Sequence, residues 1–166
     1  ALLADAFGRV AAARPDVSLV VVGDDHGGQA AFEAGAERHG YVDRLHLIGP
    51  LFDDRKHAAL RDAAVFCLPS LHEGFSMAIT EALAWGRPVV ISDACHFPEV
   101  ASHGCGIETA LEASEIAQGL LQTLSDPVAA DAMGSRGREL VFARYTWPRI
   151  AERTVSLYHR LLENKS

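Results

Sequence analysis

The sequence predicts an α/β fold built around a mainly parallel sheet. Short apolar runs rich in β-branched residues alternate with longer amphipathic segments, which is the pattern of strand–helix–strand units. The run 17–22 (VSLVVV) is apolar almost throughout, as expected of a parallel strand that is covered on both faces. Gly23, Gly49 and Pro69 each follow such a run, where the chain has to turn at a strand end.

The individual elements follow from spacing and from chain-terminating residues. Apolar residues of the first segment recur at helical spacing, and Pro15 ends that helix. Asp126-Pro127 divides two later helices, and Trp147 opens the last one. In chain order we expect a helix at 2–13, a strand at 17–22, a helix at 29–39, a strand at 44–48, a helix at 54–62, a strand at 64–68, a helix at 76–85, a strand at 89–92, a short helix at 97–102, a short strand at 105–108, and helices at 112–124, 128–142 and 147–163.

Length and composition exclude several classes of protein. The 166 residues amount to one domain, and a net charge of -7 argues against a nucleic-acid partner, which would require a basic surface. The three cysteines are odd in number and lack the spacing of a zinc site, which favours a reducing, cytoplasmic compartment. No apolar run is as long as a membrane span, which takes roughly 18 residues. The eight histidines show no spacing typical of a metal site.

The segment 69–92 (PSLHEGFSMAITEALAWGRPVVIS) carries the strongest chemical signal. A strand ends before a short loop with Glu73 and Gly74, and a helix begins near Ser76. The first turn of a helix offers free backbone N–H groups and a positive dipole end, which favour an anion. Glu73 in the loop and Glu81 in the helix add two carboxylates, which accept strong hydrogen bonds from sugar hydroxyls. An anion flanked by diols describes a nucleotide sugar.

Each of these residues also has a simpler interpretation. A Glu on a helix is most often a solvated surface residue, and a Ser at a helix start is usually only a cap. Only the combination is specific to a ligand.

The combination resembles the group 1 glycosyltransferases, whose members have the GT-B fold. The residues that match are Pro69-Ser70, Glu73-Gly74-Phe75-Ser76, Glu81-Ala82-Leu83-Ala84 and Gly86-Arg87-Pro88-Val89-Val90, with further likeness at 19–23, 42–49, 98–100 and 145–147. Glu73 and Glu81 reproduce the Glu-x7-Glu spacing of the family. The resemblance implies a Rossmann-like three-layer sandwich, the C-terminal half of a GT-B enzyme.

The resemblance also assigns roles to residues. Glu73 corresponds to the catalytic Glu beside the donor sugar, and Glu81 to the Glu that holds the ribose hydroxyls. The backbone N–H groups expected to contact the donor sugar and its diphosphate are those of Gly74, Phe75, Ser76 and Met77. The nucleobase is expected near Gly49 and Leu51. Ser76 departs from many members, which have Gly there. The implied chemistry is retaining transfer of a hexosyl unit from a UDP- or GDP-type donor to a sugar, lipid or glycan acceptor, without a metal or other cofactor.

The resemblance further implies that residues 1–166 are the donor-binding domain of a longer enzyme. The chain opens at Ala1 inside what resembles the helix after the family's first strand, so that strand, its Arg and Lys, and the N-terminal acceptor domain are expected outside it. We therefore expect this chain alone to bind donor weakly and to be inactive. Any peripheral membrane contact would be made by the longer protein. We also expect the strands at 17–22 and 64–68 to pair directly, or another chain or another segment to lie between them.

Two alternatives remain open at this stage. One is a nucleotide-sugar epimerase of the same fold. The other is a non-catalytic module for nucleotide-sugar binding or protein interaction.

Overall fold

The alternation of strands and helices expected from the sequence is present in the computed structural model, which describes residues 2–163. The helices are α1 (Leu2–Ala13), α2 (Gln29–His39), α3 (Asp53–Asp62), α4 (Met77–Ala84), α5 (Glu99–Ser102), α6 (Ala113–Ser125), α7 (Pro127–Arg144) and α8 (Trp147–Glu163), with 3-10 turns η1 (Val42–Arg44) and η2 (Asp93–Cys95). The strands are β1 (Leu19–Val21), β2 (Leu45–Leu47), β3 (Phe66–Leu68), β4 (Val89–Ser92) and β5 (Gly106–Thr109). Every predicted element is found, and the two 3-10 turns were not predicted.

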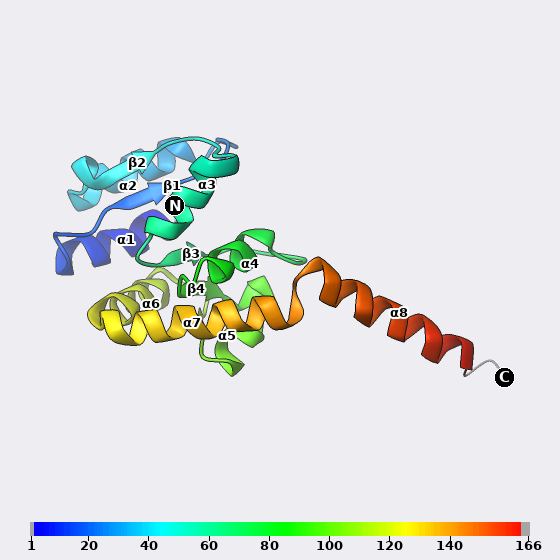
Figure 1. The fold of residues 1–166 in the computed structure, drawn as a ribbon. Coiled ribbons are helices and arrows are strands. Elements are labelled where there is room, and N and C mark those ends of the chain that lie inside the picture. Colours follow the sequence, from blue (N-terminus) through cyan, green and yellow to red (C-terminus); the bar gives the residue numbers. More distant parts are fainter. Residues whose placement is uncertain (1, 164–166) are drawn as a thin grey trace.

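The strands form two separate parallel sheets in the part of the chain that the structure describes. β1 pairs with β2, and β3, β4 and β5 form the second sheet in that order. Helices cover both faces, so the architecture is the expected three-layer α/β sandwich (Figure 1). The predicted strands were up to three residues too long, because only the residues that pair with a neighbouring strand remain in the ladder.

The expected direct pairing of the strands at 17–22 and 64–68 is wrong. Within residues 2–163, β1 bonds only to β2 and β3 bonds only to β4. Leu19 of β1 and Cys67 of β3 both pack on the cluster formed mainly by α1 and α6, so one helical layer supports both strands. Strands pair only when their backbones approach to about 4.8 Å, and sharing this layer does not by itself bring β1 and β3 together.

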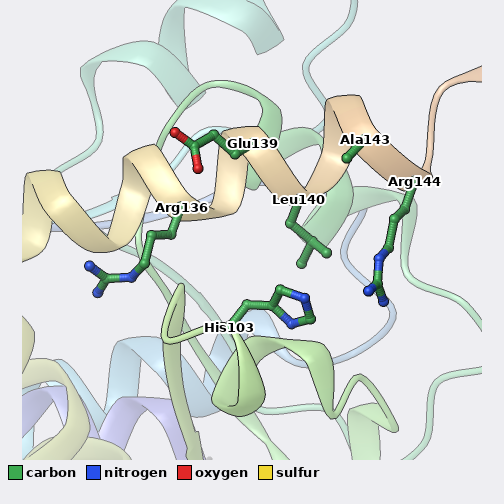
Figure 2. A pocket seen from close by; sticks show the side chains of 6 residues that line it. All are labelled: His103, Arg136, Glu139, Leu140, Ala143 and Arg144. Carbon is green, nitrogen blue, oxygen red and sulfur yellow. The ribbon is translucent and has the colours of Figure 1, made fainter.

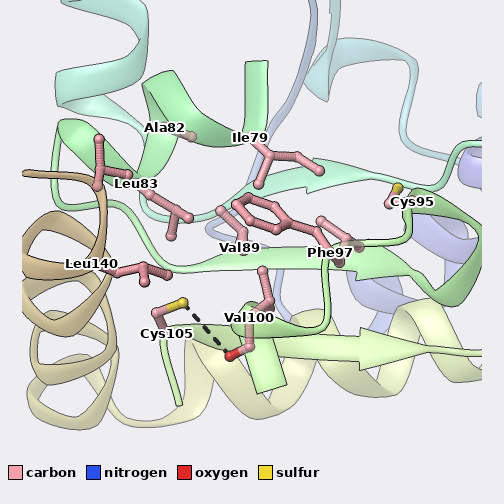
Figure 3. Packing of buried hydrophobic residues seen from close by; sticks show 11 residues of the cluster. Ile79, Ala82, Leu83, Val89, Cys95, Phe97, Val100, Cys105 and Leu140 are labelled. Atoms are coloured by element: carbon pink, nitrogen blue, oxygen red, sulfur yellow. Dashed lines mark hydrogen bonds between the residues drawn. The ribbon is translucent and has the colours of Figure 1, made fainter. Parts of the chain in front are cut away.

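Two hydrophobic cores lie on opposite faces of the sheets. The first joins α4, α7 and one face of β4, and Figure 3 shows Ile79, Leu83 and Leu140 meeting there around Phe97. The second joins α1, α2 and α6 to the other face, which includes Val90 of β4. All four residues of β4 are buried, as expected of the central strand of its sheet.

α7 lies very close to the turn that follows α4. A Cβ atom built on Gly134 of α7 would lie 1.9 Å from the carbonyl oxygen of Gly86. Only a glycine permits this approach, because the obstructing atom belongs to the backbone. The close packing fixes the C-terminal end of α4 against the body of the domain.

α8 extends away from the rest of the domain (Figure 1). None of its described residues is buried, and Trp147 is 80% exposed. No helix within residues 2–163 is long and apolar enough to span a membrane.

Candidate functional site

The predicted site residues occupy two neighbouring loops and one helix. Gly49 and Leu51 follow β2, and the segment Glu73–Ser76 follows β3 and leads into α4. Because the strands of each sheet are parallel, these loops extend from their carboxyl ends, where ligands bind in α/β folds of this kind. Met77 is the first residue of α4, and Glu81 lies one turn further along it.

Three hydrogen bonds fix the end of β3 and the loop after it to the end of β4 and the segment that follows. The Ser92 hydroxyl donates to the carbonyl oxygen of Ser70 at 2.6 Å, and the Cys95 thiol donates to the carbonyl oxygen of Leu68 at 3.3 Å. The Glu73 backbone N–H donates to the carbonyl oxygen of Ala94 at 3.2 Å. Ser92 and Cys95 are buried, so this anchor is largely shielded from water. The backbone that carries Glu73 is therefore held in place without a ligand.

Ser76 caps α4, as the simpler interpretation of the sequence predicted. Its hydroxyl oxygen accepts from the backbone N–H of Ile79, and its carbonyl oxygen accepts from the Thr80 hydroxyl at 2.7 Å. The residue is only 7% exposed. The side chain thus points into the helix turn, and Ser76 presents its backbone rather than its hydroxyl to a ligand.

The start of α4 leaves several backbone donors free. Within the described residues, the N–H groups of Gly74, Phe75, Ser76 and Met77 have no protein acceptor. A Cβ atom built on Gly74 would meet nothing within 4 Å, so the loop is open at this point. Free donors at the positive end of a helix dipole are suited to bind an anion.

Phe75 fixes the loop from the opposite side. Its ring centroid lies 5.5 Å from Tyr145 and 6.0 Å from Phe97, and those two rings lie 5.5 Å apart at 77°. Burial, followed by the charge and hydrogen bond of Glu99, raises the pKa of Tyr145 to about 12, so its phenol is neutral in this cluster. The ring of Phe75 packs on the body of the domain while its backbone N–H remains free.

Glu81 forms an ion pair that sequence reasoning did not identify. The Lys56 ammonium on α3 donates to Glu81 Oε1 at 2.7 Å, and the side chains are 36% and 33% exposed. Lys56 lies in the helix that follows the loop of Gly49 and Leu51. The ion pair therefore links the expected nucleobase loop to the expected ribose carboxylate. The two residues are 25 positions apart on different helices, so no local pattern indicated this contact.

Gly49 adopts a conformation that favours glycine. Its φ is +68°, and its carbonyl oxygen accepts from the Gly23 backbone N–H at 3.1 Å. This bond joins the loop after β1 to the loop after β2. Leu51 follows two residues later and is partly buried.

The described residues contain no group of three or more His, Cys, Asp or Glu side chains placed to hold a metal ion.

A hollow of about 370 Å³ lies between His103, at the end of α5, and α7 (Figure 2). It is lined by none of the predicted site residues, and the side chains of Arg136 and Arg144 lie at opposite ends of it. His103 precedes β5, so the hollow begins at the amino end of that strand, away from the loops of the candidate site.

A three-layer domain with parallel strands and with its candidate ligand loops at their carboxyl ends is a Rossmann-like domain. Residues 1–126 match the model of the family described as "Glycosyl transferases group 1". The chain therefore belongs to the group 1 glycosyltransferases. Its fold is that of the C-terminal domain of GT-B enzymes, as the resemblance of the sequence implied.

Individual relatives support the same family. The chain is 31% identical over 168 residues to a phosphatidyl-myo-inositol mannosyltransferase of Mycobacterium leprae, which covers 99% of this chain and 44% of the relative. It is 33% identical over 126 residues to the MMP alpha-(1->4)-mannosyltransferase of Mycolicibacterium hassiacum. This match covers 74% of this chain and 31% of the relative. The crystal structure of Anabaena Alr3699/HepE in complex with UDP superimposes with a TM-score of 0.83 at 22% identity. The superposition covers 96% of this chain and 44% of the HepE chain. The chain spans less than half the length of each of these proteins.

Proposed function

We propose that residues 1–166 bind the nucleotide-sugar donor of a retaining glycosyltransferase. The enzyme transfers a hexosyl unit from a UDP- or GDP-type donor to a sugar, lipid or glycan acceptor. One observation carries this proposal: the free N–H groups at the start of α4 lie between two carboxylate-bearing positions, Glu73 and Glu81, on one anchored segment. The named relatives support hexosyl transfer, since both are mannosyltransferases, and the HepE complex supports a nucleotide ligand.

The proposed chemistry is electrostatic stabilisation without a metal. The N–H groups of Gly74 to Met77 bind the diphosphate as it leaves, and Glu73 orients the reacting sugar through its hydroxyls. Glu81 accepts hydrogen bonds from the ribose diol, and the loop of Gly49 and Leu51 contacts the base. Each contact to the helix dipole contributes about 0.3–1 kcal/mol when it is exposed. The chain alone therefore binds donor weakly and is inactive without an acceptor domain supplied by the longer protein.

The proposed setting of the enzyme is the cytoplasm. Cys67, Cys95 and Cys105 are all free thiols, which supports a cytoplasmic location. The phosphatidyl-myo-inositol mannosyltransferases act, by their name, on a lipid headgroup, and a lipid acceptor would bring the longer protein to a membrane surface. No nucleic acid is proposed as a partner, because the net charge is -7.

Calorimetric titration with UDP, GDP and their hexose conjugates tests the binding function. Glu81→Gln should weaken nucleoside diphosphate binding about tenfold or more, because hydrogen bonds to a charged group contribute about 1.5–3 kcal/mol. Glu108→Gln, which changes an exposed carboxylate on β5, serves as the matched control. Sub-micromolar binding by the isolated chain would contradict the weak affinity proposed here. A Glu81 variant that binds as well as the parent chain would support a non-catalytic module.

Product analysis with the full-length protein tests the reaction. The product of the parent enzyme should keep the anomeric configuration of the donor. Glu73→Ala should abolish glycosyl transfer. Release of an epimerised sugar in the absence of acceptor would instead identify an epimerase.

A further inference from the structure

Lys56 contacts the carboxylate to which the proposed function assigns the ribose. The Nζ–Oε1 distance of 2.7 Å is that of a charge-assisted hydrogen bond. Glu81 Oε2 has no protein donor among the described residues, so one oxygen is held by lysine and the other is free to accept. A carboxylate has enough acceptor sites to bind a lysine and a sugar hydroxyl together.

The contact joins two helices that follow different strands. α3 follows the loop of Gly49 and Leu51, whereas α4 follows the loop of Glu73. Beside the ion pair, the His57 ring lies 5.7 Å from the ring of Trp85 at the end of α4. The position of Glu81 relative to the loop after β2 is thus set by side chains of α3.

We propose that Lys56 is a positioning residue for ribose recognition: it holds the Glu81 carboxylate in the orientation that accepts the 2′- and 3′-hydroxyls. This inference rests on the proposed function of Glu81. Lys56 acts through the carboxylate and selects ribonucleotide donors over donors that lack the ribose diol.

If the ion pair mainly stabilised the fold, loss of Lys56 would lower the unfolding temperature. The positioning role predicts a different result. Both side chains are about one-third exposed, and exposed ion pairs contribute little to folding stability. Loss of Lys56 should therefore leave the unfolding temperature almost unchanged while it weakens ribonucleotide binding. Arg55→Met is the matched control, because it removes a positive charge from the neighbouring exposed position of α3.

The experiment measures the affinity of the full-length protein for UDP and GDP and for their 2′,3′-dideoxy forms. Lys56→Met should weaken ribonucleotide binding about tenfold, since the coupling between residues in contact typically changes binding by this order. Dideoxynucleotide binding should be unchanged. Lys56→Arg should restore much of the affinity. In a Glu81→Gln background, Lys56→Met should cause no further loss.

Four results would overturn the inference. An equal loss for ribo and dideoxy forms would mean that Lys56 touches the base or the phosphates directly. A fall in unfolding temperature that accounts for the weaker binding would mean a structural role. No effect of Lys56→Met, together with loss of ribose discrimination in Glu81→Gln, would remove the role of Lys56 and leave the proposed function intact. If Glu81→Gln also keeps full ribose discrimination, the assignment of Glu81 itself fails.

Discussion

The hydroxyl oxygen of Ser76 accepts a hydrogen bond from the backbone N–H of Ile79 and so closes the first turn of α4. Ser76→Ala removes this acceptor and should lower the free energy of unfolding by about 0.5–2 kcal/mol. Ser76→Gly should cost only a few tenths of a kcal/mol, because glycine is tolerated at the position before a helix. Urea denaturation of the three proteins measures the difference. A Ser76→Ala variant as stable as the parent protein would show that the hydroxyl does not cap the helix.

The same substitutions separate capping from ligand binding. Because the hydroxyl points into the helix, Ser76→Gly should keep the affinity for nucleoside diphosphates within about twofold, a change well under 1 kcal/mol. A large loss of affinity in the Gly variant would show that the hydroxyl contacts the ligand.

The close approach of α7 to the turn after α4 makes Gly134 sensitive to a single methyl group. Gly134→Ala places a Cβ atom 1.9 Å from the carbonyl oxygen of Gly86, and a backbone atom cannot move aside cheaply. We expect a loss of about 1–3 kcal/mol in unfolding free energy. Ser135→Ala on the exposed side of α7 is the control and should stay within about 0.5 kcal/mol. A Gly134 variant as stable as this control would contradict the packing described here.

The ring of Phe75 should matter more for binding than for folding. Phe75→Ala removes ring contacts with Phe97 and Tyr145, which are worth about 0.5–1.5 kcal/mol. The loop then loses the support that fixes its free N–H groups, so nucleoside diphosphate affinity should fall. Phe142→Ala is the matched control, because Phe142 is 54% exposed and Phe75 is 52% exposed. Unchanged affinity in the Phe75 variant would separate the aromatic cluster from the site.

We expect the folded protein to lose stability at high pH because of Tyr145. Its pKa is raised from 10.0 to about 12, so the folded protein favours the neutral phenol. The stabilisation is complete below pH 10 and is lost as the pH rises from about 10 to about 12. Tyr145→Phe has no proton to lose, so the parent chain should become less stable relative to this variant across that interval. Thermal unfolding of both proteins at a series of pH values tests the prediction, and parallel curves would refute it.

Sequence patterns predicted the order of elements well because glycine and proline mark most of the boundaries. The helix at 29–39 and the strand at 89–92 were predicted with their observed ends. The loop of Glu73 was placed correctly, since the change from a strand pattern to a helix pattern occurs within a few residues. The division into two sheets was not predicted, because strand pairing depends on how distant segments are placed in space, and no local pattern encodes that placement.

The site itself was only partly predictable. The residues after β3 belong to one continuous segment, so a motif could identify them. The contact of Lys56 with Glu81 depends on the packing of α3 beside α4, and nothing in either local pattern encodes it. The buried orientation of the Ser76 hydroxyl likewise became clear only from its partners, because a capping Ser and a ligand-binding Ser look identical in sequence.

We expect the separation of β1 from β3 to give the domain two units of unequal protection from hydrogen exchange, the β1–β2 sheet and the β3–β4–β5 sheet. β4 is buried and bonded on both sides, so its amides should exchange with solvent only when the whole domain unfolds. Among residues 2–163, β1 has a strand partner on one side only, and Val20 is 50% exposed, so its outer amides should exchange through much smaller openings. The loop of Gly49 belongs to the looser unit and the loop of Glu73 to the tighter one. A donor that touches both loops would couple the two units, and its binding would slow exchange furthest in β1 and β2.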